Sequence, residues 1–193
     1  MSVDRFVLVR HATPSDGDDP GLSARGRAEA MALAKRLAGW RLDAAWSSDT
    51  NRAVQTAEAI LAAREAPALH RSVALREVEL PPEGGRPAGS ADYRDWEMET
   101  LGRLARDLAG WLEVATAGPK GRRTPEECAN VLVVSHAGPL RVLLCLLLGL
   151  PVRAHWSFRV DRASLSIVEW TGDLGTITLL NDRCHLEIDR YDR

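Results

Sequence analysis

Cysteine is scarce in this sequence: its 193 residues include only Cys128, Cys145 and Cys184. Without a CxxC spacing the three offer no zinc framework, and an odd number of this kind is typical of a reducing compartment. Long apolar runs are also missing, since the longest, 142–150, is about half the length that a bilayer crossing requires. The first residues, with Asp4 close to two arginines, lack the pattern of a secretory signal. We therefore expect a soluble, cytoplasmic protein without a membrane partner.

An excess of charge of one sign is absent as well. The chain carries 25 lysines and arginines against 27 aspartates and glutamates, a formal net charge of −2. This balance gives no global electrostatic reason to expect nucleic acid as a partner, so any site for an anion must be local. With 45% apolar and 27% charged residues, the composition is that of a globular chain, not of a disordered or fibrous one. We expect a single domain over residues 1–193, with no internal repeat.

Short apolar runs alternate with segments of helical periodicity along the chain. Such alternation favours an α/β fold with a largely parallel sheet. The predicted strands cover residues 5–10, 43–46, 131–134, an edge strand at 72–76, and a terminal hairpin made of 164–170 and 175–180. The predicted helices cover residues 23–40, 50–65, 93–115 and 139–148.

Two of the predicted strands end next to a histidine. His11 follows the run Val-Leu-Val-Arg, and His136 follows Val-Leu-Val-Val-Ser. Ligands of open α/β sheets gather beyond the carboxyl ends of the strands, so both imidazoles are expected to face one cleft. Taken alone, either histidine is explained as simply by a hydrogen bond within its own loop. The repetition of one strand-to-loop context favours the shared cleft.

Two further segments offer charged side chains near strand ends. Residues 47–57 run from a predicted strand into the start of a helix, where backbone N–H groups and Arg52 would hold an anion. Glu77 stands just beyond the predicted edge strand. A solvated surface arginine and an exposed glutamate are the plain alternatives for these two residues.

Together these residues fit one reaction. A phosphoryl group in transfer carries negative charge on three oxygens, and the guanidinium forks of Arg10 and Arg52 match them. A neutral histidine offers a lone pair for in-line attack, and a protonated one adds a donor, so His11 and His136 divide these roles. Glu77 would protonate the departing alkoxide and then accept a proton from water. No carboxylate cluster suits magnesium, so the expected reaction uses no metal and no cofactor.

The order of these motifs resembles the histidine phosphatase superfamily, also called the phosphoglycerate mutase-like family. Single motifs are weak, but the matches run in family order from Phe6 to about Pro151. They are Val9-Arg10-His11, the helix entry of residues 22–30, Ser47-Ser48 with Arg52-Ala53 and Gln55-Thr56-Ala57, Leu75-Arg76-Glu77, and Ser135-His136-Ala137-Gly138.

The resemblance implies a three-layer α/β/α sandwich with a mostly parallel central sheet and the site above the strand ends. It also implies that His11 is the nucleophile, which the charge argument alone could not decide, with Glu77 and His136 as the other catalytic residues. The phosphate-binding set is Arg10, Arg52, Thr13 and Ala137.

The sequence departs from the family pattern at several places. Ala12 replaces the usual glycine after the nucleophile, and Gly17 stands where many members have a phosphate-binding asparagine, which leaves Thr13 or Ser15 to supply the hydrogen bond. The usual residues after Glu77 are replaced, so Glu79 is a second candidate for the proton donor. We predict that residues 78–120 form a cap over the pocket.

The expected function is a metal-independent phosphatase that hydrolyses a small phosphomonoester through a phosphohistidine. Alternatives are a phosphoglycerate mutase, a phosphohistidine protein phosphatase, against which the presence of Glu77 argues, and a phosphate-binding pseudoenzyme. α-Ribazole phosphate, sugar phosphates and phosphoglycerate all remain open as substrates, and so does a homodimer. Arg153, Arg159 and Arg162 around Trp156 either widen the positive pocket or form a solvated face.

Overall fold

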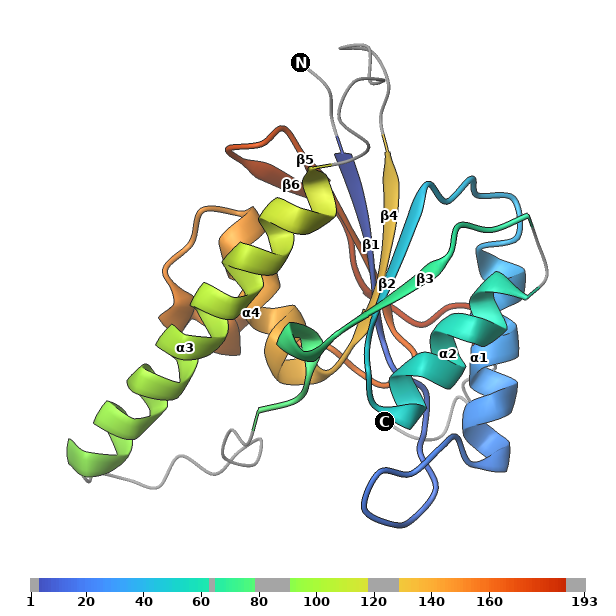
Figure 1. Ribbon diagram of the computed structural model, residues 1–193, viewed down its shortest axis with the longest axis horizontal. Helices are drawn as coiled ribbons and strands as arrows, with labels where there is room; N and C mark the ends of the chain where they lie inside the picture. The colour runs from blue at the N-terminus through green and yellow to red at the C-terminus, as the bar shows by residue number, and fades with distance from the viewer. Residues whose placement is uncertain (1–3, 63–64, 79–90, 118–128, 187–193) are drawn as a thin grey trace.

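A computed structural model of the chain describes residues 4–62, 65–78, 91–117 and 129–186, with the side chains of α3 described from residue 97 onward (Figure 1). A six-stranded sheet in the order β3-β2-β4-β1-β5-β6 forms its centre. The strands are β1 (Asp4–Arg10), β2 (Ala44–Ser48), β3 (Leu69–Ser72), β4 (Asn130–Ser135), β5 (Leu165–Trp170) and β6 (Gly175–Asp182).

The sheet is mixed. β3, β2, β4 and β1 pair in parallel, whereas β5 runs antiparallel to β1 and β6 antiparallel to β5. The parallel strands β1 and β4 lie at the centre, and each carries four consecutive apolar residues, as expected of strands covered on both faces. The predicted largely parallel α/β sheet is confirmed, and the predicted terminal hairpin supplies the antiparallel edge.

Helices cover both faces of the sheet, which makes three layers (Figure 1). Val7 and Val9 of β1 point to one face and pack with α1 (Ala24–Arg36) and α2 (Asn51–Leu61). Phe6 and Leu8, their neighbours along the strand, point to the other face and pack with α3 (Ala91–Thr116) and α4 (Ala137–Leu147). Successive side chains of a strand alternate between the two faces, so one short run supplies both halves of the core.

The predicted edge strand at 72–76 is wrong in position. Strand β3 ends at Ser72, and Val73–Leu75 form the 3₁₀ turn η1, for which the Ser72 hydroxyl accepts a hydrogen bond from the N–H of Ala74 at 3.3 Å. Val73 is exposed and Leu75 is fully buried, so their alternation imitates the period of a strand. The polar β3 pairs only with β2, at the edge of the sheet, where few apolar residues are needed.

The predicted cap of residues 78–120 falls partly on α3. Leu101, Leu104, Leu108 and Trp111 of this helix belong to the hydrophobic core, so its second half is part of a sheet-covering layer. Residues 79–90 and 118–128 lie outside the described residues. A cap formed by the segment before Leu101 remains a prediction.

The arrangement brings several loops to one edge of the sheet. β1 and β4 are parallel and end together, with Arg10 opposite Ser135. β5 runs the other way and pairs its first residue, Leu165, with Val9, so the loop that precedes β5 reaches the same edge. Among the described helices, none is both long and apolar enough to span a bilayer.

Candidate active site

His11 is the first residue after β1 and is buried, with 5% of its surface exposed. Its backbone N–H donates to the carbonyl of Ser135 at 2.9 Å, which fastens the loop after β1 to the end of β4. The ring Nδ1 lies 2.8 Å from the carbonyl oxygen of Ala12. Because a carbonyl only accepts, Nδ1 carries the proton, and Nε2 of the neutral ring keeps a free lone pair.

The surroundings of His11 keep it neutral. Burial lowers its pKa to about 3, and the positive charges of Arg52, Arg10 and Arg162 act in the same direction. The hydrogen bond to the Ala12 carbonyl opposes this shift without cancelling it. The ring is therefore available as a nucleophile or base over the whole range near neutral pH.

His136 stands directly before α4 and is fully buried, beside His11. The two ring centroids are 5.0 Å apart, with the ring planes at 61°. Arg52 donates from a terminal nitrogen to Nδ1 of His136 at 3.4 Å, so the proton of this ring sits on Nε2, which donates to the Ser48 hydroxyl at 3.0 Å. Burial lowers the pKa of His136 to about 2, helped by His11, Arg52 and Arg10. In this arrangement His136 is neutral.

Arg52 lies in the first turn of α2, as predicted, and is held by two contacts. One is the contact with His136, and the other is an ion pair with Asp19 at 3.8 Å. Asp19 also accepts the backbone N–H of Asn51 at 3.1 Å, which ties the loop after His11 to the start of α2. Arg10, at the end of β1, donates to the carbonyl of Val160 at 2.7 Å.

Glu77 follows η1 and is exposed as a residue, and its carboxylate reaches the first turn of α4. Its Oε1 accepts the N–H of Gly138 at 3.1 Å, and the N–H of Ala137 also stabilises the carboxylate. Ala137, predicted as a phosphate-binding residue, thus directs its N–H at Glu77. Loss of water around the carboxyl raises the pKa of Glu77, although these N–H groups and Arg10 oppose the shift. A raised pKa suits a carboxylic acid that donates a proton.

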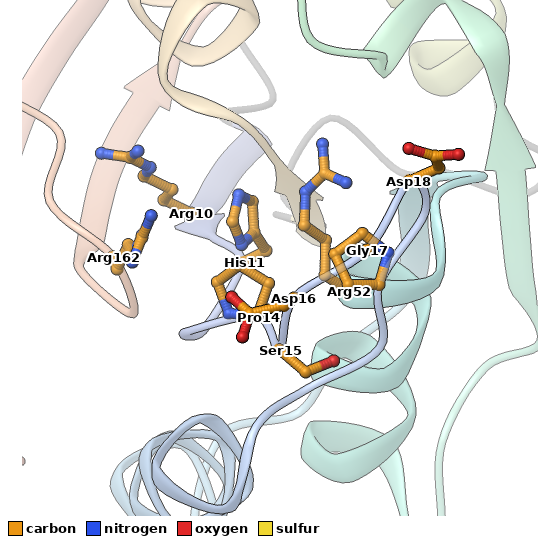
Figure 2. A pocket seen from close by; sticks show the side chains of 10 residues that line it. Arg10, His11, Pro14, Ser15, Asp16, Gly17, Asp18, Arg52 and Arg162 are labelled. Carbon is orange, nitrogen blue, oxygen red and sulfur yellow. The ribbon is translucent and has the colours of Figure 1, made fainter.

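An open pocket of about 470 Å³ lies over His11 (Figure 2). Figure 2 shows Arg10 and Arg162 on one side of the His11 ring and Arg52 on the other. The lining consists of three arginines, one histidine and the loop after it: Arg10, His11, Pro14, Ser15, Asp16, Gly17, Asp18, Pro20, Arg52 and Arg162. This places two of the predicted phosphate ligands and the predicted nucleophile around one cavity.

Four of the seven predicted site residues do not line this pocket: Glu77, His136, Thr13 and Ala137. Thr13 is not among the lining residues, and its N–H donates to Glu29 at 2.8 Å; its neighbour Ser15, the other candidate for that hydrogen bond, does line the pocket. Glu77 is outside this lining too, with its carboxylate at the first turn of α4. Glu79, the second candidate proton donor, lies outside the described residues.

Positioning residues around His11 escaped the sequence analysis. The Thr56 hydroxyl accepts the N–H of Ala12 at 3.1 Å and donates to the carbonyl of Arg52 at 2.7 Å, so it joins the nucleophile loop to the arginine helix. On the other flank, Gly26 at the start of α1 lies so close to the Thr13 carbonyl that a Cβ would overlap it. The family motif contained both residues, but only the geometry shows what each contacts.

Arg162 is the lining residue that the predicted site set omitted. The sequence left open whether Arg162 widens the positive pocket or belongs to a solvated face. The structure distinguishes the three exposed arginines, because Arg162 lines the pocket, whereas Arg153 does not and Arg159 pairs with Asp161 at 2.9 Å. Within the described part of the chain, no group of three or more histidine, cysteine or carboxylate side chains is arranged to hold a metal ion.

Comparisons with known proteins show which proteins this chain is similar to. Phosphoserine phosphatase 1 of Hydrogenobacter thermophilus is 29% identical over 210 residues, which cover 94% of each chain. The adenosylcobalamin/alpha-ribazole phosphatase of Escherichia coli is 29% identical over 209 residues, covering 93% of this chain and 96% of its own. A crystal structure of a putative alpha-ribazole-5'-P phosphatase from Escherichia coli has the same fold, with a TM-score of 0.72 at 24% identity, over 93% of this chain and 97% of that one.

The model of the histidine phosphatase superfamily (branch 1) matches residues 6–183, which include every described residue of the site. The resemblance seen in the order of the sequence motifs is confirmed by this match. The chain belongs to the histidine phosphatase superfamily.

Proposed function

We propose that the chain is a metal-independent phosphatase that hydrolyses small phosphomonoesters through a phosphohistidine on His11. The observation that carries the proposal is the state of the His11 ring: Nδ1 is engaged by the Ala12 carbonyl, Nε2 keeps its lone pair, and a cavity with guanidinium groups on both sides lies above it. The names of the relatives support a phosphoric monoester hydrolase.

In the first step Nε2 of His11 attacks phosphorus and the bond from phosphorus to the alcohol oxygen breaks. Arg10 and Arg52 hold the phosphoryl oxygens, on which negative charge gathers in the transition state. Protonated Glu77 gives its proton to the departing oxygen, and the raised pKa supports this role. His136 orients Arg52 through the contact at Nδ1 and packs against the His11 ring.

In the second step the Glu77 carboxylate takes a proton from a water molecule, whose oxygen attacks phosphorus. The bond between phosphorus and Nε2 breaks, inorganic phosphate leaves, and His11 returns to its neutral form. The proton balance closes, because Glu77 gives one proton in the first step and recovers one in the second.

The test is the variant His11→Ala assayed with p-nitrophenyl phosphate. We expect loss of turnover, with the wild type unaffected by EDTA and yielding an acid-labile phosphohistidine when quenched during turnover. His70→Ala, which changes an exposed histidine on β3, serves as the matched control and should keep wild-type activity. Full activity of His11→Ala would reject the proposal.

The same trapping experiment distinguishes the proposed phosphatase from a phosphoglycerate mutase and from a phosphate-binding pseudoenzyme. A phosphoglycerate mutase would form the phosphohistidine but pass the phosphoryl group to an acceptor alcohol in preference to water. A pseudoenzyme would bind phosphate without forming the phosphohistidine at all.

A further inference from the structure

Arg162 differs from the other two arginines of the pocket in having its guanidinium uncommitted. Arg10 donates to the Val160 carbonyl, and Arg52 contacts His136 and Asp19. Among the described residues, Arg162 makes no hydrogen bond and no ion pair, yet it lines the cavity beside His11 (Figure 2). Its five N–H donors are therefore available to a ligand.

The backbone that carries Arg162 is held in place by an unusual turn. Ala163 is buried and has a φ of 52°, a conformation that costs energy for a residue with a side chain. Its N–H donates to the carbonyls of both Arg10 and His11, at 3.1 and 3.3 Å. The turn thereby joins Arg162 directly to the nucleophile loop.

A second set of contacts braces the other side of the turn. The N–H of Asp161 donates to the Asn181 side chain at 2.7 Å, and the Asn181 amide donates back to the Asp161 carboxylate at 3.0 Å. Asn181 also has a φ of 52°. A solvated surface arginine needs no such support, whereas an arginine that must meet a ligand in a set direction does.

Arg162 differs from Arg10 and Arg52 in its electrostatic effect on the two histidine rings. Arg10 and Arg52 both lower the pKa of His11 and of His136. Arg162 contributes only at His11, where its effect is the smallest of the three arginines. Arg162 is also exposed, whereas His11, which lines the same cavity, is buried. Its guanidinium is thus placed for the outer part of a substrate whose phosphoryl group sits at His11.

We propose that Arg162 binds a carboxylate on the alcohol portion of the substrate, so that the enzyme favours phosphorylated hydroxy acids and hydroxy amino acids over phosphorylated neutral or purely cationic alcohols. The planar fork of a guanidinium matches a carboxylate in a bidentate fashion. A second phosphate fits less well, because Asp16 and Asp18 line the same cavity and repel a dianion more strongly than a monoanion. This inference rests on the proposed phosphatase function.

The experiment compares two substrates that differ only by a carboxylate, O-phosphoserine and O-phosphoethanolamine. We expect the wild type to favour phosphoserine in kcat/KM by about tenfold or more, mainly through KM. Arg162→Ala should reduce this preference to within about twofold, with a much larger loss of kcat/KM on phosphoserine than on phosphoethanolamine. Arg162→Lys keeps the charge without the fork and should fall between them.

Arg153→Ala is the matched control, since it removes an exposed arginine that does not line the pocket. It should leave the preference unchanged. An equal loss on both substrates in Arg162→Ala would place Arg162 on the phosphoryl group, and no loss on either would make it a solvated residue; both results overturn the inference. Failure of the phosphatase proposal is distinguishable, because then either the wild type would turn over neither substrate or His11→Ala would retain turnover of both.

Discussion

The imidazole rings of His11 and His136 lie edge to face with their centroids 5.0 Å apart, although they follow different strands. Each is held by a different partner: the Ala12 carbonyl fixes the tautomer of His11, and Arg52 fixes that of His136. Two neutral rings of opposite tautomer thus stand side by side beneath a cavity that arginines line. Because both pKa values lie far below neutrality, the two rings keep their neutral form throughout the range near neutral pH.

The first prediction concerns Glu77 and the leaving group. A proton donor matters most for a poor leaving group, so Glu77→Ala should lower kcat/KM for an alkyl phosphate by about 10²- to 10⁴-fold and for p-nitrophenyl phosphate far less. Because the pKa of Glu77 is raised, the wild type should lose kcat/KM for the alkyl phosphate as pH rises through that pKa. Equal losses on both substrates would remove Glu77 from the role of acid and leave Glu79 as the candidate.

The second prediction concerns stability and pH. In the unfolded chain both histidines titrate near 6.5, but burial lowers the pKa of His11 to about 3 and of His136 to about 2. Between these values the unfolded state binds more protons, so their contribution to stability is present above about pH 6.5 and is lost as the pH falls.

The expected loss is on the order of 1 kcal/mol per pH unit for each of the two rings. Urea unfolding followed at several pH values between neutrality and mild acid measures it. Glu77, whose pKa is raised, acts in the opposite sense. In His136→Gln no proton can bind at this position, so the free energy of unfolding should fall less steeply as the pH is lowered. An unchanged slope would mean that His136 does not resist protonation.

The third prediction concerns Thr56 as a positioning residue. Thr56→Val leaves the N–H of Ala12 without its acceptor and should cost about 1–3 kcal/mol of stability. It should also lower kcat more than it raises KM, because the hydroxyl joins the nucleophile loop to the helix of Arg52. Thr56→Ser keeps the hydroxyl and should recover most of the activity. If the valine and serine variants have the same kcat, Thr56 acts only by packing.

The fourth prediction concerns the close approach of Gly26 to the nucleophile loop. A methyl group at this position overlaps the Thr13 carbonyl, so Gly26→Ala should destabilise the protein by about 1–3 kcal/mol and reduce activity. Gly110→Ala, in the exposed interior of α3 with nothing near its Cβ, is the control. That change should be neutral or stabilise the fold by up to about 1 kcal/mol, as alanine does in helices.

The sequence predicted correctly those features that depend on the burial of the central strands and on their common direction. The runs before His11 and His136 are apolar because central parallel strands are covered on both faces, and parallel strands bring their ends to one edge. The closeness of the two imidazole rings therefore followed from the residue pattern alone. Thr13 and Ala137 were assigned by resemblance; their N–H groups meet Glu29 and Glu77, and their contacts with phosphate stay a prediction.

The rest could not be predicted for two reasons. The run Ser72–Arg76 has strand-like alternation, but Ser72 can accept a hydrogen bond that starts a 3₁₀ turn, and sequence periodicity does not register that choice. The predicted site set omitted Arg162, because the rule that ligands bind beyond the carboxyl ends of strands considers only the loops that follow parallel strands. β5 is antiparallel, so the loop that precedes it reaches the same edge of the sheet.

The reversed direction of β5 has an evolutionary consequence. Chemistry at His11 is anchored in β1 and β4, while the arginine that faces the outer cavity is carried by the turn that enters β5. The side chain at position 162 can therefore diverge among descendants of one ancestor, while the backbone hydrogen bonds that join the turn to Arg10 and His11 are kept. A fold of this kind can acquire new substrates by a substitution at Arg162 that leaves the backbone of the turn in place.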